Sequence, residues 1–180
     1  MKNTLLLIGI VSLSSCCEKT LTTYDLNELQ KSIVSYKLND VVKFETSEGE
    51  TLITKVHEVK DSYMTNENGC DEFHFGEKRA ILTNEKNNYY FSVEKKSKNV
   101  LSIGVIIGNL DYSNSNYSGM YYYNQDNTFE YTTINVDGLT FENSIKLTGD
   151  PDTNIYTIIS KTNGIEYMHL GNNKWIKRIN

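Results

Sequence analysis

The chain has 180 residues, with 23 acidic side chains against 18 basic ones and a formal net charge of -5. This length suits a single domain of ordinary size that has a core of its own. Nucleic-acid-binding proteins usually carry a basic patch or stripe, so the acidic balance argues against a nucleic-acid partner. The densest basic run, Lys95-Lys96-Ser97-Lys98, is more typical of a solvated hairpin turn.

The first fifteen residues have the pattern of an export signal. Lys2 supplies a positive charge, residues 5–11 form an apolar stretch, and small residues follow before Cys16. The apolar stretch is too short to cross a bilayer, which takes about 20 residues. We therefore predict that residues 1–15 are a signal peptide that is removed from the mature protein.

The residues around the cleavage point also predict a membrane anchor. Leu13-Ser14-Ser15-Cys16 resembles the bacterial lipobox, and the resemblance implies cleavage before Cys16 and acylation of that cysteine with palmitate-type chains. Two or more acyl chains hold a protein stably on a bilayer, whereas one chain holds it only marginally. We expect a lipid-anchored protein of the bacterial cell envelope, at the outer membrane, with the leaflet left open. The alternative is an ordinary secreted protein with a coincidental cysteine.

Two cysteines remain if Cys16 carries the lipid. An exported protein can form a disulfide between Cys17 and Cys70, which would fasten the chain near the lipid to the domain. The competing hypothesis leaves Cys17 in a flexible tether and Cys70 as a free thiol in the polar loop 66–71. The sequence leaves both hypotheses open.

The segment after the lipidation site is polar and contains few residues typical of a core. We expect a tether over residues 16–31 and a single all-β domain over residues 32–180. One short helix is predicted near residues 25–33, because Leu26, Leu29 and Ile33 have helical spacing. Asp25, with Glu28 three residues later, has the pattern of a helix cap.

From Val34 onward, short β-rich runs alternate with Asn, Asp, Gly and Ser. The clearest hairpin joins residues 41–46 to residues 51–59, with a bulge near Thr54-Lys55 that restores the alternation of apolar positions. Asp137-Gly138 is the strongest turn signal, because a two-residue type I′ loop needs positive φ at both positions. Further strands are predicted at 77–83, 89–94, 100–107, 120–124, 128–136, 139–147, 154–160, 165–170 and 174–179.

Regular short strands with tight connections predict an all-β protein. We expect an antiparallel meander that forms a barrel-like or strongly curved sheet, with at most one short N-terminal helix. The single proline, Pro151, lies in an expected loop, and the 13 tyrosines suit half-exposed strand surfaces.

Two stretches have the form of hairpins. One runs from Tyr156 to Tyr167 and continues to Asn173-Lys174-Trp175, and the other is the early segment 36–40 with its Gly49-Glu50 turn. Both resemble hairpins of uncharacterised lipoproteins of Bacteroidota. The resemblance implies an all-β exported lipoprotein. It transfers no catalytic residues.

Motifs for catalysis and metal binding are missing from the sequence. No His-Glu-x-x-His pair and no Gly-x-Ser-x-Gly elbow occurs, so we expect no enzyme, no catalytic residue, no metal and no cofactor. His74 with Cys70, Asp71 and Glu72 is a mixed cluster that could ligate a metal, but zinc sites normally show a more regular spacing. The segments 111–116 and 150–154 contain calcium-like oxygen donors, and the same residue types are ordinary loop formers.

The aromatic concentration around residues 112–123 is the candidate binding surface. A polar loop over residues 113–119 leads into three consecutive tyrosines, and we select Tyr112, Tyr117 and Tyr122 as binding residues. Rings that belong to the core are the alternative. We expect a non-enzymatic binding or accessory module, anchored to the membrane through Cys16. The alternative is a structural or surface protein that contacts another protein or a glycan, and an enzyme without a recognisable motif is the third hypothesis.

Overall fold

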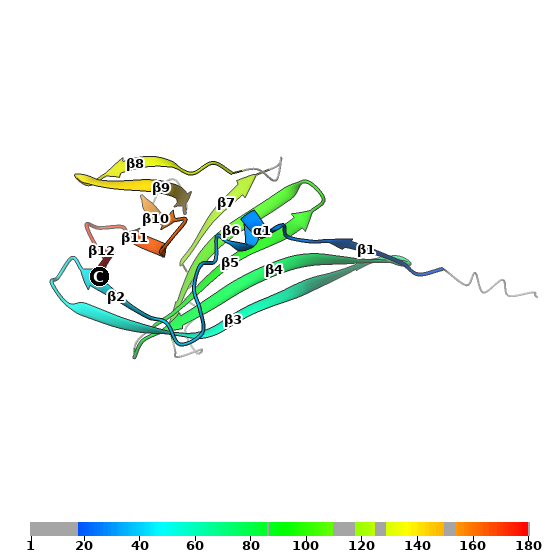
Figure 1. The fold of residues 1–180 in the computed structure, drawn as a ribbon, viewed down its shortest axis with the longest axis horizontal. Coiled ribbons are helices and arrows are strands. Elements are labelled where there is room, and N and C mark those ends of the chain that lie inside the picture. Colours follow the sequence, from blue (N-terminus) through cyan, green and yellow to red (C-terminus); the bar gives the residue numbers. More distant parts are fainter. Residues whose placement is uncertain (1–17, 86, 110–117, 125–128, 150–153, 180) are drawn as a thin grey trace, which may run out of the picture.

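The structure, a computed structural model, describes residues 18–85, 87–109, 118–124, 129–149 and 154–179. These residues form one strongly curled, almost wholly antiparallel sheet, a half-barrel with one short helix (Figure 1). The prediction of an all-β fold is therefore confirmed. The elements are β1 Thr20–Tyr24, α1 Glu28–Lys31, β2 Val41–Thr46, β3 Thr51–Asn68, β4 Asp71–Thr83, β5 Asn87–Ser97, β6 Val100–Asn109, β7 Ser118–Asn124, β8 Thr132–Val136, β9 Leu139–Thr148, β10 Ile155–Ser160, β11 Gly164–Leu170 and β12 Trp175–Ile179.

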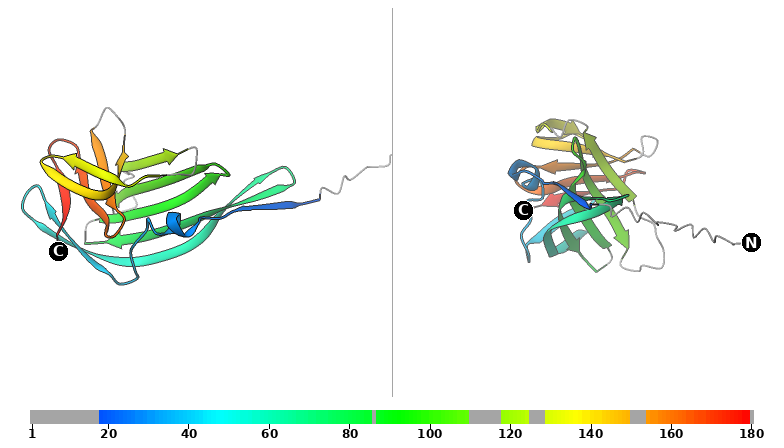
Figure 2. Two further views of the ribbon diagram at one scale, coloured as in Figure 1. Left: turned by 45° about the horizontal axis from the view of Figure 1, so that its top comes forward. Right: turned by 90° about the vertical axis from the view of Figure 1, so that its right-hand side faces the viewer.

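The strand order is that of a curled meander. Strands β2 to β7 are neighbours in chain order, and so are β9 to β12, while β8 pairs only with β9. Strand β12 returns to pair with β2, and β7 meets β9 at the single pair Tyr121 and Thr148. The sheet therefore curls so that β2, near the start of the chain, lies beside β12, at its end (Figure 2).

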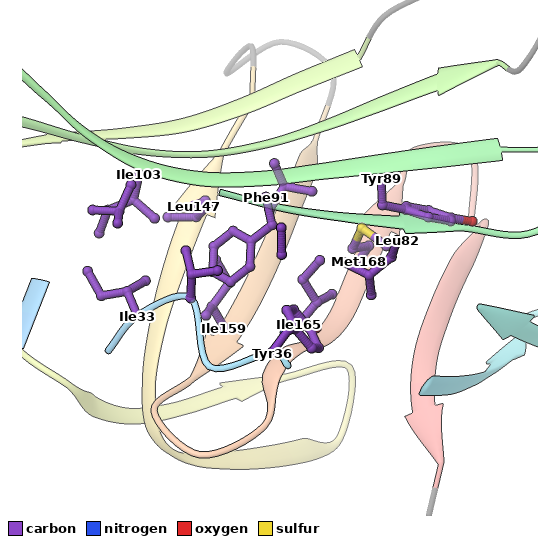
Figure 3. Packing of buried hydrophobic residues seen from close by; sticks show 14 of the residues in the cluster. Ile33, Tyr36, Leu82, Tyr89, Phe91, Ile103, Leu147, Ile159, Ile165 and Met168 are labelled. Carbon is purple, nitrogen blue, oxygen red and sulfur yellow. The ribbon is translucent and has the colours of Figure 1, made fainter. Parts of the chain in front are cut away.

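The inside of the curl is filled with apolar side chains. Phe91, Ile103 and Leu147 are fully buried there, on strands from both halves of the sheet (Figure 3). Ile33 and Tyr36, from the segment before β2, pack into the same cluster. The core therefore ties the N-terminal segment to the sheet.

Two hairpin turns contain residues with positive φ. Asp137 and Gly138 have φ values of 52° and 76°, as the type I′ turn between β8 and β9 requires. Gly164, at the start of β11, has a φ of 73°.

The hairpin β3–β4 is much longer than the sequence predicted. The ladder continues to Asn68 and Asp71, through the segment expected to be a loop. We call its projecting part, residues 60–68 and 71–78 together with β1, the blade (Figure 1). The blade has no buried apolar row along residues 60–68, so the alternation on which strand prediction depends is missing there.

The bulge that was expected near Thr54-Lys55 lies at a different place. The register of β3 against β4 shifts between Val56 and Glu58, which makes His57 the extra residue. Thr54 and Val56 are both buried, so the alternation is regular up to this point and a bulge is needed only after it.

The predicted tether is partly folded. Strand β1 pairs in parallel with residues 71–75 of β4, and Leu26 is buried in the core. The helix cap is Asn27 with Gln30, which form a reciprocal capping box, in place of Asp25 with Glu28. The run Thr20-Leu21-Thr22-Thr23-Tyr24 is rich in β-branched and aromatic residues that favour a strand, and the edge of β4 supplies its partner.

Candidate functional site

Most of the site residues predicted from the sequence lie outside the described residues. This is so for the signal peptide and for Cys16, Cys17, Tyr112 and Tyr117. Tyr122 lies in β7, where its backbone is paired with Ile103, and its side chain is not among those described. The tyrosine surface therefore stays a prediction.

Cys70 lies at the turn between β3 and β4, at the tip of the blade. It is disulfide-bonded, so the hypothesis of a free thiol at this position is wrong. The pairing with Cys17 stays a prediction, because Cys17 is outside the described residues.

The polar residues near Cys70 are paired with one another. Glu72 Oε2 lies 2.5 Å from Lys19 Nζ, and Glu72 Oε1 lies 2.7 Å from His74 Nε2. The hydrogen bonds from Lys19 and then His74 hold the pKa of Glu72 below its usual value. Among the described residues no group of three His, Cys, Asp or Glu side chains is arranged to hold a metal ion.

The clearest candidate for a ligand site is a hollow of about 210 Å³ at the end of the half-barrel remote from the blade. We call it the end hollow. It lies between the turns β2–β3 and β11–β12 and the start of β5. Its walls are apolar and its rim is polar; the lining residues are Thr46, Ser47, Glu48, Glu50, Leu52, Asn87, Tyr89, Ile107, Leu170, Lys174, Trp175 and Ile176.

Backbone and side-chain hydrogen bonds fix the rim of the end hollow. Thr46 Oγ1 accepts hydrogen bonds from the backbone N–H groups of Glu48 and Glu50, at 3.2 and 3.1 Å. The Ser47 N–H donates to the Trp175 carbonyl at 2.9 Å, which joins the β2–β3 turn to β12. Across the rim, Lys174 Nζ lies 3.7 Å from Glu48 Oε1. Because both groups are exposed, this ion pair contributes little to stability.

A second depression, of about 330 Å³, adjoins the end hollow. The two share Glu50 and Leu52, and Ile53, Asn84 and Glu85 also line the second one. The lining of the two hollows includes three carboxylates, of Glu48, Glu50 and Glu85, and one ammonium group, of Lys174. The region is therefore net negative.

A second aromatic cluster lies under the β8–β9 hairpin, and sequence reasoning did not find it. The hydroxyls of Tyr156 and Tyr167 both donate to Asp137 Oδ2, at 2.7 and 2.8 Å. Burial, followed by the bonds to Asp137, raises the pKa of both phenols. The His169 ring stacks on Tyr156 with ring centroids 5.1 Å apart, and Trp175 stacks on Tyr167. These rings pack this hairpin onto the sheet, and Trp175 joins the cluster to the end hollow.

The fold defines a class: an all-β protein with a strongly curled antiparallel half-barrel and a projecting blade. No protein-family model, curated protein or solved structure matches the chain. Within the part of the chain that the structure describes, none of the helices has the length and apolar character needed to cross a membrane.

Proposed function

We propose that this protein is a non-enzymatic binding module, held at the bacterial envelope membrane by lipid on Cys16, and that the end hollow is its ligand site. The main support is the end hollow, which is an open apolar concavity with a fixed polar rim beside the buried apolar cluster of the described half-barrel. Concave, mostly apolar sites with a few placed polar groups are the usual form of ligand sites.

The size of the end hollow limits what it can hold. Its volume of about 210 Å³ is below the range of roughly 300–1,000 Å³ that is usual for drug-sized ligands. Tyr89 on its wall belongs to the same buried cluster as Leu82 and Phe91, so this packed core leaves little room there for a long acyl chain. The hollow suits one ring-sized group or one unit of a polymer.

The chemistry of the walls favours a neutral or cationic group. Tyr89 and Trp175 provide flat aromatic surface, and Glu50 and Asn87 provide polar groups at the rim. Sugars and peptide side chains use such combinations of flat apolar contact and directed hydrogen bonds. The net negative rim disfavours anionic ligands. The partner is therefore a glycan or another protein.

The anchor has separate support. The lipobox-like stretch 13–16 implies lipidation of Cys16, and the disulfide at Cys70 is typical of an exported protein, because thiols are kept reduced in the cytosol. The membrane itself is then a partner, through the lipid.

The fluorescence of Trp175 tests the ligand site directly. Trp175 is the single tryptophan of the sequence and it lines the end hollow, so a ligand bound there changes its emission. We would titrate chitobiose as a neutral disaccharide, trilysine as a cationic peptide and octyl glucoside as an amphiphile. At least one probe should give a saturable change.

A variant on the rim and a matched control variant test whether the response comes from binding in the end hollow. Glu50→Arg should weaken the saturable response at least fivefold, because it places a longer side chain and the opposite charge on the rim. Glu28→Arg makes the same change at an exposed position on α1 and should leave the response unchanged. An equal response in both variants, or no response to any probe, would contradict the end hollow as the ligand site.

A further inference from the structure

We infer that the protein stands end-on on its membrane, with the tip of the blade at the bilayer and the end hollow at the far end, open to the aqueous compartment. This inference rests on the proposed lipid on Cys16. It adds to the proposed function the side from which a partner reaches the site.

The path of the chain places the anchor next to the blade tip. β1 begins at Thr20, which is paired with Asp71, the residue after Cys70 in the β3–β4 turn. Cys16 is four residues before Thr20 in the chain, and an extended chain spans at most about 3.5 Å per residue. The lipid-bearing residue is therefore within about 14 Å of the blade tip.

Two kinds of interaction hold the start of the described chain along the blade. β1 pairs with five consecutive residues of β4, and Lys19 Nζ contacts both Glu72 and Glu67, at 2.5 and 3.6 Å. Cys70 at the same tip is disulfide-bonded, and the predicted pairing with Cys17 would add a covalent bond there. A chain held in this way limits how far the body can swing about the anchor.

The hairpin β3–β4 separates the two functional ends of the molecule. β3 starts at Thr51, beside the end hollow, and ends at Asn68 in the blade tip. From the first to the last of its 18 residues there are about 17 steps of about 3.3 Å, which give a path of about 56 Å along the strand. Figure 1 shows the β2–β3 turn and the blade tip at opposite ends of the long axis.

The charge of the tip opposes insertion of the blade into the bilayer. Lys19 contacts the carboxylates of Glu67 and Glu72. Two more carboxylates, Glu18 and Asp71, lie next to Lys19 and Glu72 in the sequence, so the described tip is net negative. Carboxylates are repelled by the negative potential of anionic lipid surfaces. The acyl chains thus provide the membrane contact, and a ligand for the end hollow comes from the aqueous compartment rather than from the underlying bilayer.

Energy transfer from two labelled positions to the membrane tests the orientation. The full-length lipidated protein is reconstituted in vesicles of neutral and anionic phospholipid with an acceptor dye on the lipid headgroups. A donor is attached through p-azidophenylalanine at Glu48, on the rim of the end hollow, or at Asn68, in the blade tip; both positions are exposed. We expect transfer from position 68 to exceed transfer from position 48 at least fivefold.

The outcomes separate the orientation from the anchor. Similar transfer from both positions, or stronger transfer from position 48, would overturn the end-on orientation while leaving the anchor intact. Protein that fails to float with the vesicles gives no transfer from either position, and that result would reject the lipid anchor together with the orientation. Solubilisation in detergent should abolish transfer from position 68 and serves as the control.

Discussion

Asp137 has two roles, one through its backbone and one through its side chain. Its positive φ of 52° forms the β8–β9 turn, and its carboxylate accepts hydrogen bonds from two buried phenols, Tyr156 and Tyr167. A hydrogen bond to a charged acceptor is stronger than one between neutral groups. The carboxylate itself is exposed, which reduces the gain.

Replacing Asp137 by Asn tests this role, since Asn also tolerates positive φ. We predict that Asp137→Asn lowers the free energy of unfolding by about 1 kcal/mol, because the phenols lose a charged acceptor. Asn135→Ala is the control on the same hairpin. The Asn135 side chain accepts an exposed bond from Thr140, and its loss should change stability by less than about 0.5 kcal/mol. Urea unfolding measures both variants, and equal effects would contradict the prediction.

The effect of Asp137 should depend on pH. The hydrogen bonds from Tyr156 and then Tyr167 hold the pKa of Asp137 below its usual value of 3.8. Its contribution to stability is therefore complete above pH 3.8 and is lost as the pH falls through the lower pKa of the folded state. The difference between wild type and Asp137→Asn should be constant from pH 5 to 7 and should shrink below pH 3.8. A difference that grows on acidification would contradict this assignment.

At the scale of elements, the start of β11 packs closely against the segment that precedes β2. The Tyr36 hydroxyl accepts a hydrogen bond of 2.8 Å from the Ile165 N–H, and its ring lies over Gly164. A Cβ atom at Gly164 would come within 2.7 Å of the Tyr36 ring. Glycine is therefore needed at this position for space as well as for its positive φ.

A pair of glycine variants separates these two requirements. Gly138 has a φ of 76° but nothing within 4 Å of the added Cβ, so Gly138→Ala should cost about 1 kcal/mol for backbone strain alone. We predict that Gly164→Ala costs about 3 kcal/mol, because the clash with Tyr36 adds to the strain. Thermal and urea unfolding measure the difference. Equal destabilisation by the two substitutions would contradict the close packing of Tyr36.

The segment before β2 behaves as part of the domain in this structure. Leu26 is 5% exposed, whereas Leu29 is 51% exposed, although both lie in the range expected to be a tether. We predict that Leu26→Ala lowers stability by about 2–3 kcal/mol, because it leaves a cavity in the core. Leu29→Ala should change stability by less than about 0.5 kcal/mol. Insensitivity of unfolding to Leu26→Ala would show that the domain does not depend on this segment.

The hairpins were predictable because their residues act locally. Asp137-Gly138 and the alternating residues 41–46 determine turns and faces without help from distant parts of the chain. The blade and β1 could not be predicted in this way, since β1 depends on an edge of β4 that lies some 50 residues away. The end hollow could not be predicted from the sequence for the same reason. Glu50, Asn87 and Trp175 come together only when β12 pairs with β2.

At the scale of the whole molecule, the elongated hairpin β3–β4 joins the end proposed to be anchored to the end proposed to bind a ligand. The blade tip carries the disulfide at Cys70 and the start of the described chain, and the opposite end carries the end hollow. If the lipid is on Cys16, the packed half-barrel presents its open end to the compartment beyond the membrane. The lipid on Cys16 is therefore the claim on which both the location and the orientation depend.

The intact mass of the protein purified from bacterial membranes tests this claim most directly. We predict the mass of a chain that begins at Cys16 and carries a diacylglyceryl group, with a non-reduced peptide that joins Cys17 to Cys70. Cys16→Ser should abolish both the cleavage and the added lipid mass. A chain that begins at any other residue, or one without added lipid, would contradict the account.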